Sequence, residues 1–387
     1  MRPPFLARVI GAGPTGSLAA LALADAGWSV TLEDPLTASQ LCDRQRAYAF
    51  THSSRRLLGR LGLWEAVEPL LVPFHALQLQ DRALGRGLIF EGDDLPGASG
   101  PGPAMPVGWI GRHHPLLTLL LERLALHPSV SLRLGPPPAV TAASPAPDSW
   151  QLVVAADGPG STTRQGLGIG CWGWTYSQHC LTAEIELRGQ GVDQAWELLR
   201  PEGPLAVLPL GDGLAQLVWS APAARCRDLE ALSGTAFLDR LAGVLPEALE
   251  VDGLRDQPRA FPVALAVARR LSRGNTVLVG ESAHRCHPVG GQGLNLCWRD
   301  VAVLHRLAAR VAAGRLDPAR LGPAYGRRRW LDLLLVLIAT DLLVRLFSNR
   351  QPLLLPLRRL AMALLAAARP LRRLVLGVMT DGPPTLP

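Results

Sequence analysis

A glycine-rich turn between two short apolar segments near the N-terminus restricts the fold of this chain more than any other feature. The apolar segment at residues 7–10 runs directly into Gly-Ala-Gly-Pro-Thr-Gly, whose three glycines are Gly11, Gly13 and Gly16. An apolar helix pattern follows and ends at Gly27, a residue type that commonly terminates helices. A second strand at residues 30–32 leads to an acidic residue. This order predicts the start of an open α/β fold that binds an adenine dinucleotide on its glycine turn.

The acidic residue that ends the second strand is Glu33. It lies about 20 residues beyond the glycines, the spacing at which a carboxylate accepts hydrogen bonds from both ribose hydroxyls of such a cofactor. Because a carboxylate disfavours a phosphorylated ribose, we expect FAD or NAD rather than NADP. The pattern does not distinguish between FAD and NAD.

A second glycine-rich segment, at residues 275–301, has the character of a pocket floor. The buried strand expected at residues 276–279 ends at Gly280 and is followed at once by Glu281. A loop with Pro288, Gly290, Gly291 and Gly293 comes next, and an apolar-periodic helix starts at Leu294. Glycines let the backbone approach a ligand closely, and the free N–H groups of a helix start suit anionic oxygen. The segment therefore predicts a site for a flat, partly negative ligand.

The remaining chain divides into regions of different character. Residues 151–158 predict another buried strand, ending at Asp157 and Gly158, which either face the ligand or form a simple turn. Residues 44–64 predict an amphipathic helix start in which Arg46 either reaches a pyrophosphate or ribityl group or stays in solvent. Short alternating segments at 176–262, interrupted by a helix from Asp228 to Leu245, predict a mixed or antiparallel sheet, with edge strands from residues 77–106. Residues 135–147 are rich in proline and alanine and predict a loop.

Composition excludes several kinds of chemistry. All 39 basic residues are arginine, so no lysine can act as a base or form a Schiff base. The six cysteines include no C-x-x-C pair, which argues against a disulfide framework and against a ribbon-type zinc site. His284, Cys286 and His287 lie close together in sequence but lack a matching second pair, so no metal is expected.

The C-terminal region is helical in pattern and strongly basic. Residues 342–380 contain seven arginines and no acidic residue, a charge that equals the net charge of +7 of the whole chain. Such helices either bind an anionic membrane surface or pack on their own domain with the arginines in water. Nucleic acid is not expected, because stacking aromatics are not interleaved with the charge. The N-terminal segment is too short for a targeting sequence and no apolar run approaches ~18–20 residues, so we expect a cytoplasmic location, peripheral on the inner face of a membrane if the helices bind lipid.

Three signatures coincide with those of a known enzyme class: G-A-G-P-T-G near the start, A-D-G in the middle, and G-E-S-A-H-x-x-H-P-x-G-G-Q-G-L-N late in the chain. The chain resembles the para-hydroxybenzoate hydroxylase class of FAD monooxygenases and, within it, the ubiquinone-biosynthesis hydroxylases. Further stretches that carry the narrower resemblance are RAYAFTHSS, GPLAVLPL with LVWS, GQGLNLCWRD and TDLLVRLFSN. The resemblance implies an α/β fold with a Rossmann-like FAD-binding domain of the glutathione reductase type, an inserted mixed β-sheet substrate domain and C-terminal helices.

The resemblance also implies the domain ranges and the cofactor contacts. The FAD-binding domain would comprise residues 1–75, 104–175 and 263–335, the substrate domain 76–103 and 176–262, and the basic helical region 336–387. Pyrophosphate would lie on the three glycines of the first turn, with the adenosine ribose on Glu33. The other implied contacts are Arg46, Arg112, Asp157, Gly158, Glu281, Gly291, Gly293, Leu294 and Asn295. Glu281 stands where the family usually has aspartate, beside the ribityl chain.

The implied activity is that of an FAD-dependent monooxygenase that uses NAD(P)H as a transient reductant and O₂ to hydroxylate the aromatic ring of a prenylated quinone precursor. The implied partners are a lipophilic phenol or quinone precursor and a quinone-biosynthesis complex. His284, His287 and Pro288 are weak catalytic candidates, because they lie nearest in sequence to the ring-binding loop. The alternatives are an FAD-dependent isoprenoid reductase or cyclase, and a non-catalytic FAD-binding assembly protein.

Overall fold

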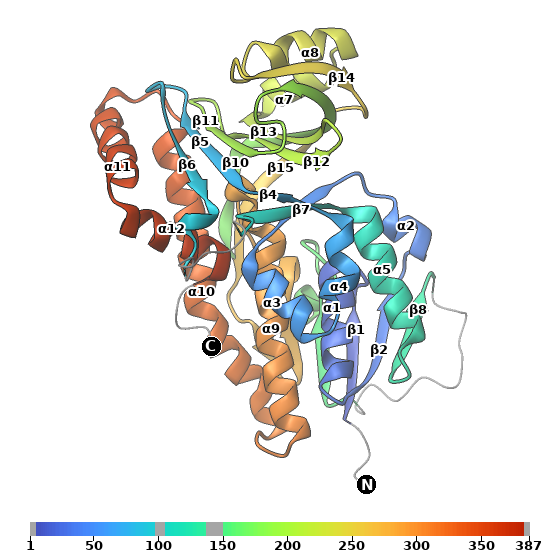
Figure 1. Cartoon of the computed structure of the whole chain (residues 1–387). Coiled ribbons are helices and arrows are strands. Elements are labelled where there is room, and N and C mark those ends of the chain that lie inside the picture. The colour runs from blue at the N-terminus through green and yellow to red at the C-terminus, as the bar shows by residue number, and fades with distance from the viewer. Residues whose placement is uncertain (1–4, 97–104, 137–149, 383–387) are drawn as a thin grey trace.

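The computed structural model describes residues 5–96, 105–136 and 150–382. The molecule contains a six-stranded sheet and a larger sheet. Figure 1 shows the first with its helices in one half of the molecule and the second, capped by α7 and α8, in the other. Most of the loop expected at residues 135–147 lies outside the described residues.

The six-stranded sheet contains the strands that the glycine motifs predict. Its order is β16-β17-β9-β1-β2-β8, parallel except for the β16–β17 pair. The strands are β1 (Leu6–Ile10), β2 (Ser29–Asp34), β8 (Val130–Leu134), β9 (Leu152–Ala155), β16 (Ser272–Arg273) and β17 (Thr276–Leu278). Neighbouring β1, β9 and β17 lie side by side although they come from distant parts of the chain. Their carboxyl ends therefore bring the three predicted motifs to one edge of the sheet.

Three helices cover this sheet. Helix α1 (Pro14–Asp25) lies against both α5 (His113–Leu126) and α9 (Gln292–Ala312), and nine of its twelve residues are buried. A helix enclosed on so many sides needs apolar residues all round rather than on one stripe, which the run of leucine and alanine in α1 provides. The core around it is the largest of the molecule.

A small three-stranded sheet connects the two halves. Its order is β3-β7-β4, all antiparallel, with β3 (Ala47–Phe50), β4 (Leu71–Phe74) and β7 (Gly108–Arg112). The prediction of a helix start across residues 44–64 is therefore wrong at β3, because pairing with β7 overrides the local pattern. The helical part is restricted to α3 (His52–Arg60) and α4 (Trp64–Val67), after the short α2 (Ala38–Cys42).

The larger sheet is mixed, as predicted. Its order is β18-β15-β10-β13-β12-β11-β5-β6, with β14 paired to β10, and only β11–β5 is parallel. The strands are β5 (Ala76–Asp81), β6 (Arg86–Glu91), β10 (Cys171–Gly189), β11 (Ala195–Leu199), β12 (Leu205–Gly211), β13 (Leu214–Pro222), β14 (Leu249–Leu254), β15 (Arg259–Ala268) and β18 (His284–Arg285). The strands expected from residues 77–106 are β5 and β6; β6 is an edge strand as predicted, whereas β5 lies inside the sheet between β11 and β6. The domain boundaries stay predictions, and those at residues 175 and 263 fall inside β10 and β15.

The helix expected from Asp228 to Leu245 is two helices. Helix α7 (Ala223–Glu230) ends before a new start at Ser233, whose side chain accepts the N–H of Ala236 and begins α8 (Gly234–Ala242). A serine in this role favours a helix start over continuation of the preceding helix. Both helices cover one face of the larger sheet and enclose a second core.

The C-terminal region forms a helical layer against the other face of the larger sheet. It comprises α10 (Pro318–Phe347), α11 (Leu355–Ala367) and α12 (Arg369–Asp381), drawn in orange to red in Figure 1. A third apolar cluster joins these helices to the larger and three-stranded sheets. In the described part of the chain, none of the helices has the length and apolar character needed to cross a membrane.

Candidate active site

The three glycines of the first turn have three different surroundings. A Cβ atom added at Gly11, where φ is +101°, would lie 2.4 Å from the carbonyl oxygen of Ala156. One added at Gly16 would lie 1.8 Å from the carbonyl oxygen of Gly11, whereas one at Gly13 would meet nothing within 4 Å. Gly11 and Gly16 are therefore required by packing. Gly13 begins α1 without a side-chain cap and leaves open space where a pyrophosphate can approach the helix N-terminus.

The acid that faces this turn is Asp34 rather than Glu33. Glu33 is engaged by Arg8, with Nη2 2.6 Å from Oε2, and by Arg133 at 3.5 Å. Asp34 accepts the N–H of Ala12, the middle residue of the turn, at 2.8 Å. Because successive side chains of a strand point to opposite faces, only one of two adjacent acids can face the turn. The sequence signal for Asp34 was its place one position further along the strand.

Asp157 organises the loop that follows β9. Its Oδ1 accepts the hydroxyl of Ser161 at 2.6 Å, and its Oδ2 accepts the N–H of Thr163 at 3.0 Å, at the start of the short helix α6 (Thr162–Gly166). Gly158 follows with φ of +79°. Since both carboxylate oxygens are engaged, the side chain of Asp157 holds the loop in place beside Gly11.

Glu281 carries a carboxylate without a partner. Gly280, with φ of +70°, packs against Thr15 in the first turn of α1, since a Cβ added there would lie 2.9 Å from Thr15 Cγ2. The chain then projects Glu281 outward, exposed, and it has no hydrogen bond or ion pair with another residue of the described ranges. The late motif is thereby placed beside the N-terminus of α1, and a free carboxylate suits ribityl hydroxyls.

The glycine loop before α9 is held by Asn295. The Asn295 amide nitrogen donates to the carbonyl of Ala49 at 2.8 Å, while its Oδ1 accepts the hydroxyl of Ser54 at 2.7 Å and the N–H of Thr51 at 3.0 Å. The side chain thus joins the start of α9 to β3 and α3. Gly291 packs on Ala49, with an added Cβ only 2.9 Å from Ala49 Cβ.

The next turn of α9 has an open side. A Cβ added at Gly293 would meet nothing within 4 Å, and Leu294 is partly buried against the main core. The backbone N–H groups at this helix start can therefore approach a ligand, with Gly293 offering the open surface. This is the arrangement that a flavin ring with partial negative charge on its carbonyl edge would use.

The two arginines expected beside the cofactor are engaged elsewhere in this structure. Arg112 makes a two-pronged ion pair with Glu184 of β10, at 3.0 and 3.2 Å. The guanidinium of Arg46 lies over the ring of Phe261 at 5.6 Å from its centre. Both therefore link the FAD-side elements to the larger sheet.

Of the weak catalytic candidates, His284 belongs to a buried charge network. Its Nε2 lies 2.7 Å from Asp300 Oδ2, and Asp300 also accepts from Arg329 at 2.5 Å. Burial alone would raise the pKa of Asp300, but its contacts with His284 and with the Arg329 guanidinium hold that pKa below its ordinary value. The network lies behind Gly280, whose N–H also donates to Asp300, so His284 supports the motif rather than facing a ligand.

His287 is also buried and neutral. Its Nδ1 accepts the N–H of Val289 at 3.2 Å, so the proton resides on Nε2 and is donated to Gln178 Oε1 at 3.2 Å. Burial lowers the pKa of His287 to about 4. Pro288 follows as the residue before the turn Val289–Gly291. Both residues shape the glycine loop.

One carboxylate at this loop was not predicted from the sequence. Glu197, on β11, accepts the N–H of Gly290 through Oε2 at 3.2 Å. Burial raises the pKa of Glu197 to about 7, an effect that the Gly290 N–H partly opposes. The only available signal was a single acid within the apolar strand sequence Ala-Trp-Glu-Leu-Leu.

Comparison with known proteins agrees with this geometry. Residues 149–331 match the family described as FAD binding domain. The chain is 31% identical over 383 residues to the 3-demethoxyubiquinol 3-hydroxylase of Escherichia coli K12, covering 93% of this chain and 94% of that protein. It is 31% identical over 406 residues to the ubiquinone hydroxylase UbiL of Rhodospirillum rubrum, covering 97% and 90%. The solved p-nitrophenol 4-monooxygenase PnpA from Pseudomonas putida has the same fold, with a TM-score of 0.76 over 97% of both chains at 19% identity.

The site and the comparisons lead to the same assignment. Open backbone at Gly13 and Gly293, two uncapped helix starts and the free carboxylate of Glu281 suit the phosphates, ring and ribityl chain of FAD. The similarity to the two hydroxylases extends over nearly the whole chain. The protein is therefore an FAD-dependent monooxygenase and belongs to the ubiquinone-biosynthesis hydroxylase family.

Proposed function

We propose that this protein hydroxylates the aromatic ring of a prenylated phenol or quinone precursor, using O₂ and electrons from NAD(P)H. The observation that carries the proposal is the end-to-end similarity to two relatives that are named as hydroxylases of ubiquinol or ubiquinone. An isoprenoid reductase or cyclase would need no O₂. An assembly protein would need no exchange of electrons with a nicotinamide.

The residues have separate roles in this proposal. The turn at Gly11–Gly13 and the N-terminus of α1 bind the pyrophosphate, and Asp34 accepts hydrogen bonds from the adenosine ribose. Glu281 binds the ribityl chain, with a reach one methylene longer than that of aspartate. The backbone at Gly291–Asn295 binds the ring edge. When bound, FAD supplies electron transfer from the nicotinamide and activation of O₂.

The apolar cluster next to this site suits a lipophilic substrate. Side chains of the larger sheet, the three-stranded sheet and the C-terminal helices meet there, among them Phe74, Phe90, Ile110, Phe347 and Met362. Such walls exclude water, which protects reactive species from hydrolysis and strengthens the few polar contacts.

A substitution at Gly13 separates cofactor binding from folding. Its φ of −67° is allowed for any residue, and a Cβ there meets no protein atom within 4 Å. We therefore expect Gly13→Val to fold with a melting temperature near that of the wild type but to lose the yellow flavin absorbance. The matched Gly16→Val variant should not fold, since its Cβ would overlap the carbonyl of Gly11.

Turnover of a defined substrate tests the reaction itself. The FAD-loaded wild type, given NADPH and a phenol that carries a geranyl chain, should consume O₂ and add one oxygen atom to the ring, detected by mass spectrometry. Product without oxygen uptake would favour the reductase or cyclase. Failure of NADH and NADPH to reduce the flavin would favour the assembly protein.

We also propose that the C-terminal helices lie on an anionic membrane surface. Exposed apolar side chains form a stripe at helical spacing on α10 and continue on the segment that includes α11: Leu331, Leu334, Leu335, Ile338, Leu342, Leu353, Leu357, Leu360 and Leu364. An apolar stripe of this extent suits the interfacial region of a bilayer. It would place the lipid-soluble substrate beside the apolar cluster described above.

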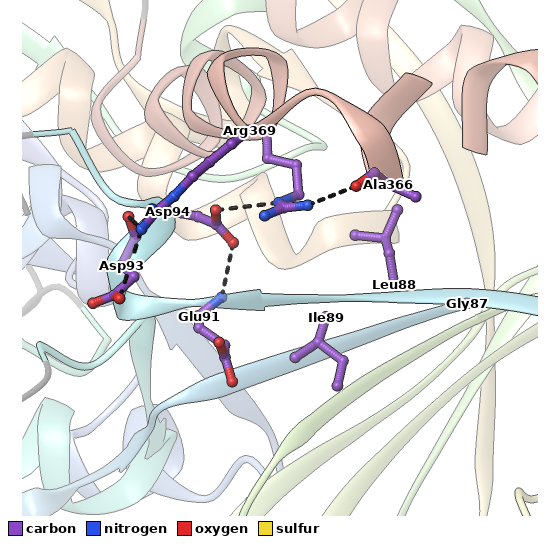
Figure 2. A pocket seen from close by; sticks show the side chains of 9 residues that line it. Gly87, Leu88, Ile89, Glu91, Asp93, Asp94, Ala366 and Arg369 are labelled. Atoms are coloured by element: carbon purple, nitrogen blue, oxygen red, sulfur yellow. Dashed lines mark hydrogen bonds and ion pairs between the residues drawn. The ribbon is translucent and has the colours of Figure 1, made fainter. Parts of the chain in front are cut away.

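The arginines support this proposal less than their number suggests. Figure 2 shows the contact between β6 and the start of α12, a shallow pocket of about 420 Å³ where Arg369 meets Asp93 and Arg372 meets Asp94. Arg373 donates to the same loop, Arg345 pairs with Asp341, and buried Arg358 donates to carbonyls at the end of α10. Within the described ranges, only Arg350 and Arg359 of the seven have no such partner. Five therefore support packing of the tail on its own chain.

A further inference from the structure

Strand β11 carries one acidic residue on a face that is otherwise apolar. Trp196 and Leu198 pack into the core beneath α7 and α8, whereas Ala195 and Leu199 pack toward the three-stranded sheet and the C-terminal helices. Because side chains alternate along a strand, Glu197 shares the face of Ala195 and Leu199. Its carboxylate is therefore directed into the apolar region beside the glycine loop, on the side where the substrate has been proposed to bind.

The neighbours of Glu197 leave one of its oxygens without a donor. On the adjacent strands its register partners are Leu79 and Ala206, whose side chains cannot hydrogen-bond. Oε2 accepts from Gly290, but Oε1 is buried and has no hydrogen-bond partner among the described residues. The residue is only 8% exposed. A buried carboxylate oxygen without a donor is unusual and costly, so this position suits a donor that arrives with a ligand.

We propose that Glu197 is a catalytic residue that accepts the hydroxyl proton of the phenolic substrate through Oε1. This inference rests on the proposed function. In the step, the O–H bond of the phenol breaks, its electron pair remains on the phenol oxygen, and the proton forms a new O–H bond with Glu197. The step consumes no oxidant. It leaves an electron-rich phenolate ring, which accepts an oxygen atom more readily than the neutral phenol does.

The electrostatic surroundings suit this role. A general base works best when its pKa is near the working pH, and the pKa of Glu197 is raised by burial to about 7. Cys180 of β10 interacts electrostatically with Glu197, and His287 is a titratable group of the glycine loop that Glu197 contacts. Burial raises the pKa of the Cys180 thiol to about 12 and lowers that of His287 to about 4, so both are neutral near pH 7. On α10, Asp341 and Arg345 neutralise each other. Arg46, stacked on Phe261, is a cation that acts on Cys180.

The pH dependence of turnover is the main test. With the geranyl-substituted phenol, kcat/KM of the FAD-loaded wild type should rise with pH through an apparent pKa of about 7. In Glu197→Gln we expect kcat to fall roughly 100-fold at pH 7. In this variant the rise of kcat/KM with pH should move toward about pH 10, where a phenol ionises without a base. Glu202→Gln is the matched control, because Glu202 pairs with Arg200 and not with the glycine loop; its profile should match the wild type.

Ligand affinity gives a test that does not depend on turnover. At pH 8 the wild type should bind the phenol about tenfold more tightly than its O-methyl ether, since only the phenol can donate to an ionised carboxylate. The preference should shrink at pH 6 as Glu197 gains a proton, and it should be independent of pH in Glu197→Gln. Tryptophan fluorescence can measure the binding of the phenol and the binding of its O-methyl ether. If Glu197→Gln fails to fold, Glu197→Asp, which retains the carboxylate, should keep the rise near pH 7 with a lower kcat.

The outcomes separate this inference from the function on which it rests. Hydroxylation by the wild type together with an unchanged pH profile in Glu197→Gln would overturn the role of Glu197 and leave the proposed function intact. A wild type that reduces its flavin but hydroxylates no prenylated phenol would overturn both. A lower kcat in Glu197→Gln with no shift of the profile would indicate a structural role, and would likewise reject the proton transfer.

Discussion

At the scale of single residues, the acids at the carboxyl end of β2 have distinct functions. Glu33 is neutralised by Arg8 and Arg133, whereas Asp34 is bonded to the glycine turn. Both acids lie about 20 residues beyond the glycines, the distance in sequence at which a ribose contact is expected. That distance alone does not show which of the two makes the contact. Because the two side chains point to opposite faces of the strand, only Asp34 contacts the glycine turn. Replacing each acid separately therefore tests which of them contributes to FAD binding.

We expect Asp34→Ala to weaken FAD binding by about 10- to 100-fold, because it removes the proposed charged acceptor of the ribose hydroxyls and a contact that holds the turn. Glu33→Ala should change FAD affinity by less than about threefold, since its ion pairs are partly exposed and contribute little. Titration of the apoproteins with FAD, followed by flavin fluorescence, measures both constants. The reverse order of effects would return the ribose contact to Glu33.

At the scale of elements, the site depends on how α9 is joined to β3. The predicted glycine loop and helix start exist as expected, with the helix beginning two residues before Leu294. The strand at 47–50 was not expected, and it is this strand that the amide of Asn295 bonds. The position of the backbone proposed to bind the flavin ring is therefore determined by a contact between segments about 245 residues apart, which no local pattern contains.

Replacement of Asn295 should disturb folding and cofactor binding together. Asn295→Ala leaves the carbonyl of Ala49, the N–H of Thr51 and the hydroxyl of Ser54 without their buried partner. We expect a loss of about 2–4 kcal/mol in the free energy of unfolding, and weaker FAD binding. Urea unfolding of the apoprotein measures the first and FAD titration the second. Full stability in Asn295→Ala would show that this junction is held by packing alone.

At the scale of the whole molecule, the C-terminal layer combines intramolecular packing with an exposed apolar surface. Its third core cluster and its ion pairs to Asp93 and Asp94 attach it to the larger sheet. The stripe on α10 and α11 is exposed among the residues that the structure describes. The basic composition of the tail by itself supported both packing and membrane binding, and the structure assigns most of the arginines to packing.

Membrane binding by this layer should depend on leucines more than on arginines. The double variant Leu357→Ser/Leu360→Ser, exposed on α11, should reduce co-sedimentation with vesicles of anionic phospholipid at least about tenfold. Arg350→Gln/Arg359→Gln should cause a smaller loss that disappears at high salt. Leu126→Ser, an exposed leucine at the end of α5, is the matched control. Unchanged sedimentation of the α11 variant would reject membrane binding by the apolar stripe. A protein partner would then be the remaining candidate to cover it.

Local spacing in the sequence determined the glycine turn and the open α/β fold that binds an adenine dinucleotide, whereas the choice of FAD came from the resemblance of longer motifs to a known family. Gly11 is required locally by its positive φ, and Gly16 by its contact with the carbonyl of Gly11, both within one strand–turn–helix unit whose residue pattern recurs. Only the tertiary structure decided which acid meets the turn, that Asp157 and His284 support loops, and that Glu197 lies at Gly290. Each of these depends on the face of the strand to which a side chain points, or on contacts between segments that are far apart in sequence. The residues next to a side chain along the chain do not specify its neighbours across a sheet.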